Sequence, residues 1–355
     1  MRILIEDGFA LERRGGIGRY TRFLLENLPQ VGIEPLLPSR PSWRGGRTLR
    51  RLQYLWWLNS ALASEAEKKT VSLVHFTNFV TPLRKTKRLP WIVTLHDLAV
   101  WRVPEAFPRG YAAYLRTAIG WSVRHADKVV TVSRAIKREI TEILGLPEEK
   151  VAVIPNAVDP LFLSASKLPP DQRQSWRHRL GFSQESYLLL YVGALERRKN
   201  LPVLFQALES LWRKRIPVAL LLVGKVGHGF VPPASSPFWR HLGSPNDEEL
   251  VRLYDLADAL VLPSLYEGFG FPVVEALARG LRPILSDIPV FREVAGPFGV
   301  YFPPEDAQAL EERILEAMNT KEPHNATPPH SEWVQHFHPE RVLQAYKALY
   351  EEVVQ

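Results

Sequence analysis

The sequence predicts an α/β protein with two doubly wound domains. Its 355 residues allow about two domains of roughly 150 residues each. Short apolar runs alternate with longer amphipathic stretches, which is the pattern of βαβ units and parallel sheets. A Pro- and Ser-rich break at 159–170 separates two such series. We therefore expect one doubly wound domain on each side of this break.

The strands of the first domain are short apolar runs of the kind found in sheets that are buried on both faces. They are expected at residues 2–6, 72–76, 91–95, 128–132 and 151–154. Helical patterns at 20–28 and 133–144 lie between them. The first domain is predicted to span residues 1–162.

The second series has the same alternation and predicts a domain over residues 163–332. Its strands are expected at 187–192, 218–223, 259–262, 283–286 and 300–302, with helices at 201–215, 247–257 and 272–279. A second Pro- and His-rich break follows at 320–331, and a helix with one apolar face is expected at 339–354.

Ligands of open α/β sheets bind outside the carboxyl ends of the strands, so residues just after strands are the candidates for function. The strongest segment follows the strand at 259–262. Gly268 and Gly270 let backbone approach a ligand, and Pro272 fits the first turn of a helix whose N–H groups attract an anion. Glu267 and Glu275 suit a hydroxyl-rich ligand such as a hexose or a ribose. The simpler interpretation is a solvated Glu267 and a Glu275 that complements the helix dipole.

The loop after the strand at 187–192 carries three cations, Arg197, Arg198 and Lys199. Arginine forks and a lysine point charge suit a diphosphate. Asn200 is expected to cap the next helix. Lys225 follows the strand at 218–223 through a glycine and is assigned to a nucleobase pocket. The alternative for the three cations is a solvated basic loop.

A Gly-Gly-Ile-Gly-Arg-Tyr segment at 15–20 follows the first strand. Thr21 breaks the dinucleotide-binding fingerprint, and no acid stands about 20 residues further on. Gly15 and Gly16 still permit close approach of a phosphate or a sugar, although a tight strand–helix turn explains them equally well.

His96, Asp97 and Asn156 also follow predicted strands. His96 can hydrogen-bond a sugar hydroxyl or stabilise charge, whereas a lone His-Asp pair is more often structural. Asn156 is either a turn residue or a contact in the site. The chain has no Cys, no nucleophile elbow, no D-x-D and no H-E-x-x-H, so no metal site is predicted.

Taken together, these segments resemble the retaining, GT-B-fold glycosyltransferases of family 4. The matching segments come in the family's order and cover roughly residues 2–305. They are 15–20, 96–97, 131–137, 154–159, 196–200, 257–264, 267–275 and 286–296. Two positions depart from the common pattern, because Ala194 follows Gly193 where many members have Arg, and Ala157 follows Asn156 where many have Gly.

The resemblance implies two Rossmann-like domains that face each other across a cleft, with a C-terminal helix, here 333–355, that crosses back to the first domain. It implies that Arg198 and Lys199 bind the diphosphate of the donor, with Arg197 or Arg198 in place of the missing loop arginine. Glu267 would hold the hexose and Glu275 the ribose. Backbone donors would come from Gly268, Phe269 and Gly270, and Gly15 and Gly16 would approach the phosphates.

The implied reaction is transfer of a hexose, with retention and without a metal, from a nucleotide sugar to a sugar or a lipid-linked acceptor. The mannosyltransferase-like members are the most similar, which favours GDP-mannose as the donor. His96 would lie at the reacting centre, and Asp97 and Asn156 on the acceptor side. The cations would neutralise the departing diphosphate, whose oxygen would take the proton of the acceptor.

Charge is distributed unequally along the chain. Residues 1–165 hold 25 Lys and Arg against 15 Asp and Glu, whereas residues 166–355 hold 20 against 23. The stretch 43–58 mixes cations with Trp and Leu, so it is either a membrane-docking segment or a core-packed helix with a basic outer side. The sequence shows no signal peptide and no apolar run of 18 residues, which predicts a cytoplasmic protein, peripheral to an anionic membrane if that segment docks.

Other classes of protein fit less well. A sugar-nucleotide epimerase or a phosphorylase would share the architecture, but the Glu267/Glu275 pair and the Arg198-Lys199 loop favour a transferase. An NAD-dependent oxidoreductase is disfavoured by the failed fingerprint. A protein that binds nucleic acid or another anion through its basic half would leave both carboxylates unexplained, so no nucleic-acid partner is expected.

Overall fold

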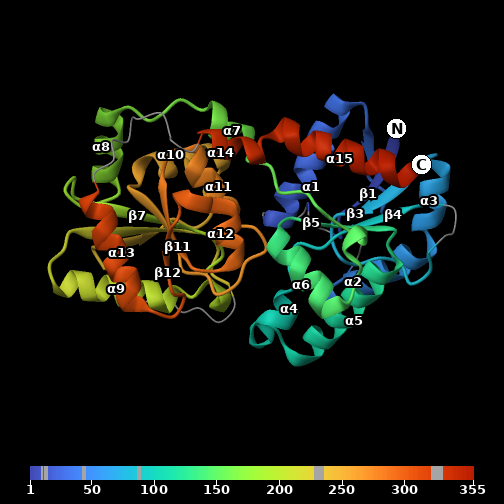
Figure 1. Ribbon diagram of the computed structural model, residues 1–355, viewed down its shortest axis with the longest axis horizontal. Helices are drawn as coiled ribbons and strands as arrows, with labels where there is room; N and C mark the ends of the chain where they lie inside the picture. Colours follow the sequence, from blue (N-terminus) through green and yellow to red (C-terminus); the bar gives the residue numbers. More distant parts are fainter. Residues whose placement is uncertain (9–10, 12–14, 42–44, 86–88, 228–235, 321–330) are drawn as a thin grey trace. The chain divides into compact units, whose positions relative to one another are not determined.

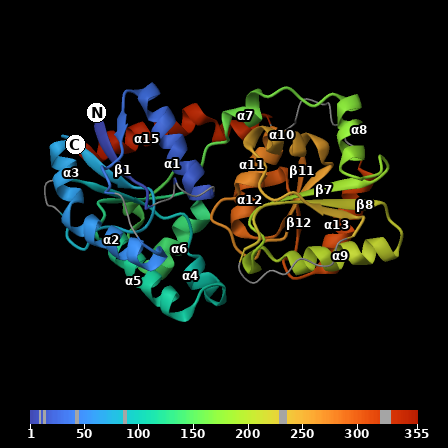
Figure 2. The ribbon, with the colours of Figure 1, turned by 180° about the vertical axis from the view of Figure 1, so that it is seen from behind.

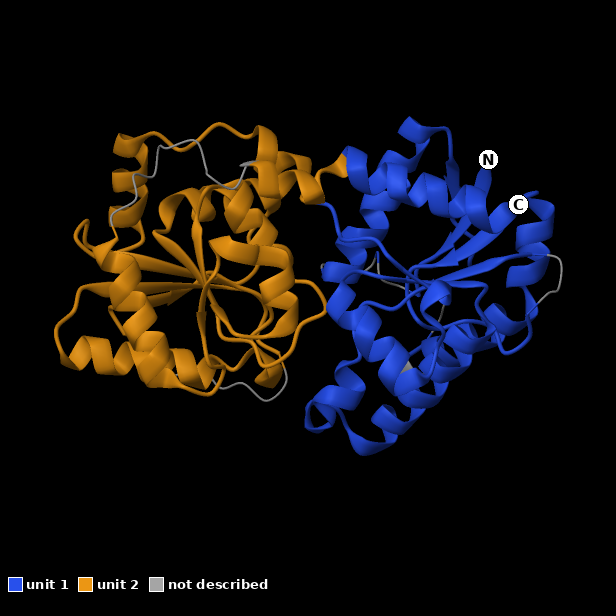
Figure 3. Ribbon diagram, in the orientation of Figure 1, with its two compact units in different colours: residues 1–157, 340–355 blue, residues 158–339 orange. Residues whose placement is uncertain are grey.

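The computed structural model describes residues 1–8, 11, 15–41, 45–85, 89–227, 236–320 and 331–355. The chain divides into two compact units (Figure 3). Unit 1 comprises residues 1–157 and 340–355, and unit 2 comprises residues 158–339. The predicted α/β class with two parallel sheets is confirmed (Figures 1 and 2).

The division between the units differs slightly from the predicted boundaries at 162 and 333. Residues 158–162 and 333–339 belong to unit 2 because their side chains pack there. The ring of Phe162 meets the ring of Tyr254 with centroids 5.3 Å apart, and Trp333 Nε1 donates to the carbonyl of Val294 at 2.8 Å.

Unit 1 contains a six-stranded parallel sheet in the order β2-β1-β3-β4-β5-β6. The strands are β1 (Arg2–Glu6), β2 (Glu34–Leu36), β3 (Leu73–Phe76), β4 (Trp91–Thr94), β5 (Lys128–Thr131) and β6 (Val151–Val153). The helices are α1 (Gly16–Asn27), α2 (Arg47–Ser60), α3 (Leu62–Lys68), α4 (Ala99–Arg102), α5 (Arg109–His125), α6 (Arg134–Leu144) and α15 (Pro339–Val354).

The two faces of this sheet are covered by different helices because successive strand residues point to opposite faces. Ile3 and Ile5 of β1 pack in one cluster with residues of α1 and α15. Glu6 points to the other face, where it accepts a hydrogen bond from the hydroxyl of Tyr54 in α2 at 3.1 Å. The last helix of the chain, α15, is therefore part of the core of unit 1.

Unit 2 contains a second six-stranded parallel sheet in the order β12-β11-β10-β7-β8-β9. The strands are β7 (Tyr187–Val192), β8 (Val218–Val223), β9 (Trp239–His241), β10 (Ala259–Leu262), β11 (Arg282–Ser286) and β12 (Val300–Phe302). The helices are α7 (Pro160–Ser164), α8 (Pro170–Arg179), α9 (Leu201–Arg213), α10 (Asp247–Leu256), α11 (Phe271–Ala278), α12 (Pro289–Ala295), α13 (Ala307–Asn319) and α14 (Ser331–Val334).

The central strands are apolar throughout because helices cover both faces of the sheet. Every residue of β8 and of β10 is buried. The sequence pattern did not predict the edge strands β2 and β9, which have three residues each. Pro35 in β2 and Arg240 in β9 interrupt the apolar pattern, and both residue types are tolerated at a sheet edge.

Candidate functional site

Two predicted loops lie next to each other in unit 2: the loop at 196–200, predicted to bind the diphosphate, and the loop at 264–270, predicted to bind the sugar. They follow β7 and β10, which are hydrogen-bonded neighbours in the parallel sheet, so both loops leave the same edge. The backbone N–H of Leu265 donates to the carbonyl of Arg198 at 2.9 Å and joins the two loops directly. The topology therefore places chemistry from two distant parts of the chain at one edge of the sheet.

A nearly buried carboxylate, Glu267, is the centre of this site. The ammonium group of Lys199 pairs with Glu267 Oε1, and Arg198 Nη1 lies 3.3 Å from Oε2. The hydroxyl of Ser264 donates to Oε1 at 2.8 Å. Arg198 also pairs through Nε with Glu196 at 2.6 Å. The structure thus brings together three of the predicted residues, Arg198, Lys199 and Glu267, as one ion-pair network.

The network controls the charge of Glu267. Burial alone would raise the pKa of Glu267, but the cations of Lys199 and Arg198 outweigh this effect and lower the pKa from 4.5 to about 2. Burial lowers the pKa of Lys199, while Glu267 opposes that change. Glu267 is therefore ionised throughout the neutral range, where it can accept hydrogen bonds but has no proton to donate.

The second predicted carboxylate, Glu275, lies inside helix α11. Its side chain is 1% exposed, and Oε2 accepts a hydrogen bond from the hydroxyl of Tyr254 in α10 at 2.7 Å. The sequence did not single out Tyr254. The signal in the sequence is the carboxylate within an apolar helix, because a buried carboxylate needs a hydrogen-bond donor nearby.

The loop from Gly268 to Gly270 ends where α11 begins. Gly270 has φ +97°, and a Cβ at this position would lie 3.0 Å from the ring of Phe291, so glycine is required there. The ring of Phe269 is buried between Phe271 and Phe337, with centroid distances of 5.6 and 5.7 Å. The side chain of Phe269 is thus core, which leaves only its backbone for the predicted role.

The remaining predicted residues of unit 2 lie at the surface of the same edge. Arg197 and Lys225 are exposed. The carbonyl of Lys225 accepts the N–H of Leu195 at 2.8 Å, so the loops after β7 and β8 are also joined. The expected side-chain cap by Asn200 is wrong. Asn200 has φ +54° and donates its amide to the carbonyl of Pro304 at 2.6 Å instead.

In unit 1, His96 and Asp97 follow β4. His96 Nε2 is 2.9 Å from the carbonyl oxygen of Thr77, and the His96 ring meets the edge of the Tyr20 ring at 4.8 Å. Burial lowers the pKa of His96, so the ring is neutral at pH 7. Asp97 accepts the N–H of Ala99 at 3.0 Å, which is the geometry of a turn residue.

Gly15, Gly16 and Asn156 are the other predicted residues of unit 1. Gly15 caps α1 with an extended backbone, and a Cβ built there would meet no atom of the described residues within 4 Å, so neither its conformation nor its packing against them requires glycine. Gly16 begins α1 and is exposed. Asn156 is 5% exposed, and within the described part of the chain its Oδ1 has no hydrogen-bond partner.

The sequence also missed a buried polar network beneath His96. The hydroxyl of Tyr20 is 2.8 Å from Thr94 Oγ1 and 2.9 Å from the hydroxyl of Tyr346 in α15. His75 Nδ1 is 2.7 Å from the hydroxyl of Tyr350, and burial lowers the pKa of His75 to about 3. A histidine in the apolar strand β3 and two tyrosines four residues apart in α15 were the available signals.

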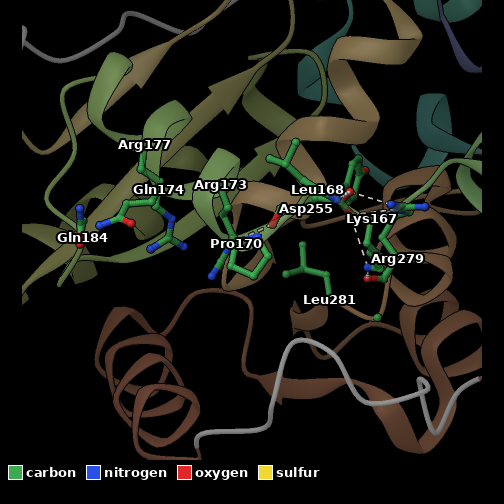
Figure 4. A pocket seen from close by; sticks show the side chains of 12 residues that line it. Lys167, Leu168, Pro170, Arg173, Gln174, Arg177, Gln184, Asp255, Arg279 and Leu281 are labelled. Atoms are coloured by element: carbon green, nitrogen blue, oxygen red, sulfur yellow. Dashed lines mark hydrogen bonds and ion pairs between the residues drawn. The ribbon is translucent and has the colours of Figure 1, made fainter.

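A cavity of about 350 Å³ lies near the amino ends of the strands in unit 2, opposite the candidate site (Figure 4). None of the predicted site residues lines it. Its cations already have partners. Arg279 makes a fork with Asp255, at 3.0 and 2.7 Å, and Arg173 and Arg177 pair with Asp258 at 2.7 and 2.6 Å. These arginines also bind backbone carbonyls, so they anchor the segment that contains α7 and α8 to the sheet.

Among the described residues, no helix is both long and apolar enough to cross a bilayer. No group of three or more His, Asp or Glu side chains in the same residues is arranged around a metal position.

Two family models match the two parts of the chain. The model described as Glycosyltransferase Family 4 matches residues 14–161, and the model described as Glycosyl transferases group 1 matches residues 186–320. The O-antigen chain mannosyltransferase B of Escherichia coli is 29% identical over 254 residues, which are 69% of this chain and 65% of the relative. The O-antigen chain mannosyltransferase RfbU of Salmonella typhimurium is 28% identical over 268 residues, 74% of this chain and 68% of the relative. The chain thus spans about two thirds of these relatives' length.

Solved structures share the fold over almost the whole chain. A sucrose-phosphate synthase from Thermosynechococcus elongatus superposes with a TM-score of 0.75 at 20% identity and covers 99% of this chain and 98% of its own. Anabaena HepE in complex with UDP-glucose superposes with a TM-score of 0.72 at 20% identity and covers 99% of this chain and 100% of its own. At this level of identity the likeness concerns the fold.

Proposed function

Because the chain belongs to the glycosyltransferases of family 4 and group 1 and has the GT-B fold, we propose that it transfers a hexose from a nucleotide-diphosphate sugar, with retention of configuration. The observation that carries this proposal is the ion-pair network of Arg198, Lys199 and Glu267. It holds two cations and an ionised carboxylate at the edge of the sheet where ligands of α/β proteins bind.

The proposed roles follow from the charges. Arg198 and Lys199 neutralise the diphosphate as the bond to the sugar breaks, and they share their donors between Glu267 and the phosphate oxygens. Glu267 accepts hydrogen bonds from the hydroxyl groups of the hexose, and Glu275 contacts the ribose. The departing phosphate oxygen takes the proton of the acceptor. The pKa of about 2 supports this route, since it makes the Glu267 carboxylate a weak base that is poorly suited to take this proton.

GDP-mannose is the proposed donor, because the two relatives above are named as mannosyltransferases. The proposed acceptor is a carbohydrate or a lipid-linked sugar, in line with the O-antigen chain in those names. His96 is proposed to lie at the reacting centre, and Asp97 and Asn156 on the acceptor side. UDP-glucose is the alternative donor to test, because it is the ligand of the similar Anabaena HepE structure.

The test is a panel of GDP-mannose, UDP-glucose and ADP-glucose with an oligosaccharide acceptor, read by product mass and by NMR of the anomeric proton. We expect one donor to give a product that is heavier by one hexose and has the anomeric configuration of the donor. Inverted product would exclude retention. Thermal stabilisation by NAD, with none by any nucleoside diphosphate, would contradict the proposed transfer altogether.

A further inference from the structure

Helix α2 is apolar on two opposite sides, and the core of unit 1 uses only one of them. Tyr54 and Trp57 point inward and are 5% and 3% exposed. Leu49, Leu52 and Trp56 are 50%, 60% and 71% exposed. Their spacing of three and four residues places these three side chains on one outer side of the helix. Single exposed apolar residues are common, but several large ones on the same side of a helix indicate a contact surface.

Neighbouring segments extend this outer side. Leu83 is 65% exposed, and its N–H donates to Asn59 Oδ1 near the end of α2 at 2.7 Å. Tyr111 and Tyr114 of α5 are 38% and 43% exposed and stack with centroids 6.2 Å apart. The guanidinium of Arg51 lies 5.6 Å from the centroid of the Tyr111 ring and joins α2 to α5, which lie side by side in Figures 1 and 2.

We call this surface the outer face; it is formed by Leu49, Leu52, Trp56, Leu83, Tyr111 and Tyr114. The segments that carry it contain cations but no carboxylate. No Asp or Glu stands between Glu34 and Glu65, between Glu67 and Asp97, or between Glu105 and Asp127. Arg51, Arg84 and Arg109 lie in these segments and are exposed.

We propose that the outer face docks on the surface of an anionic lipid bilayer. Trp56 and the leucines would enter the boundary between headgroups and acyl chains, and the arginines would bind lipid phosphates. A second copy of the chain fits poorly, because a symmetric contact would bring the cations of these segments in the two copies together. This proposal goes beyond the transfer reaction and does not depend on it.

Sedimentation of the full chain with vesicles tests the proposal. We expect binding to phosphatidylcholine vesicles that contain about 30% phosphatidylglycerol, and little binding to pure phosphatidylcholine, since each surface cation contributes about fivefold. Leu52→Ser and Trp56→Ser should each weaken binding by about tenfold or more, because each removes apolar surface from the buried boundary. Arg51→Gln should weaken binding by about fivefold.

Val354→Ser is the matched control, because Val354 is 42% exposed but lies in α15, outside the outer face. It should bind vesicles like the unchanged chain. Circular dichroism and thermal unfolding must show that all variants are folded. Equal binding of Trp56→Ser and Val354→Ser would overturn the proposal. A dimer in light scattering that Trp56→Ser dissolves would also overturn it, since the outer face would then be a contact between copies.

Discussion

Lys199 and Glu267 make the ion pair on which the proposed reaction depends. Removing the ammonium group should leave the departing diphosphate less well neutralised, and losses of about 10²- to 10³-fold in kcat are typical when one such donor is removed. We therefore expect Lys199→Ala to lower kcat by at least about 100-fold in the hexose-transfer assay. The variant should also be less stable, because its buried partner Glu267 keeps its charge with less compensation.

Lys214→Ala provides the control for loss of a Lys–Glu pair elsewhere in unit 2. Lys214 pairs with Glu311, but the lysine side chain is 60% exposed. Glu311 is only 9% exposed, but the ammonium group of Lys214 is solvated. A pair with one solvated partner should contribute about 1 kcal/mol or less, so stability and transfer should both stay near the starting values. Near-full transfer by Lys199→Ala, at a temperature where it is folded, would show that Lys199 is not a charge stabiliser in this reaction.

Glu267 should also make folding stability depend on pH in acid. Its pKa falls from 4.5 to about 2 on folding, so the ionised form favours the folded state. This contribution, roughly 3 kcal/mol, is fully present above about pH 4.5 and is lost as the pH falls towards 2. In urea unfolding, the difference between the unchanged chain and Glu267→Gln should shrink across this interval. Parallel pH profiles would show that the pKa of Glu267 is not lowered by folding.

Among the elements, helix α15 stabilises unit 1 through buried contacts with the sheet. Tyr350 is fully buried, and its hydroxyl contacts His75 in β3, so the last helix of the chain is tied to a central strand. Tyr350→Ala should cost about 3–5 kcal/mol, which is typical when a buried aromatic is truncated. Val354→Ala at an exposed position of the same helix should change stability by about 0.5 kcal/mol or less. Urea unfolding followed by fluorescence measures both, and equal effects would contradict this account of α15.

The elements also show why the sequence predicts some features and misses others. Buried parallel strands such as β8 and β10 were predictable, because covering both faces of a sheet requires unbroken apolar runs. The pairing of Lys199 with Glu267 was not, since 68 residues separate the two partners along the chain. It depends on β10 lying beside β7, although β8 and β9 come between them in sequence. The motifs identified Lys199 and Glu267 as candidates, but only the order of the strands brings the two residues into contact.

Across the whole molecule, the half of the chain with the net positive charge is not the half that contains the cations of the candidate site. The net positive charge lies in residues 1–165, whereas the cations proposed for the diphosphate lie in the second half, whose own charge is slightly negative. Donor binding in the proposal therefore depends on two cations held by Glu267 rather than on the overall field. The surplus of cations in the first half remains for other contacts, and the carboxylate-free segments of the outer face contain part of it.

The two cations Arg198 and Lys199 also determine how hexose transfer should respond to a chelator. If Arg198 and Lys199 neutralise the departing diphosphate, a divalent cation has no necessary part in that step. We expect transfer in EDTA at a rate within about twofold of the rate in Mg²⁺ or Mn²⁺, because the two side chains supply the compensating charge. The assay should vary EDTA at constant ionic strength, since salt screens exposed charges. A loss of about tenfold or more in EDTA, reversed by Mn²⁺, would assign the neutralising role to a metal and remove it from Arg198 and Lys199.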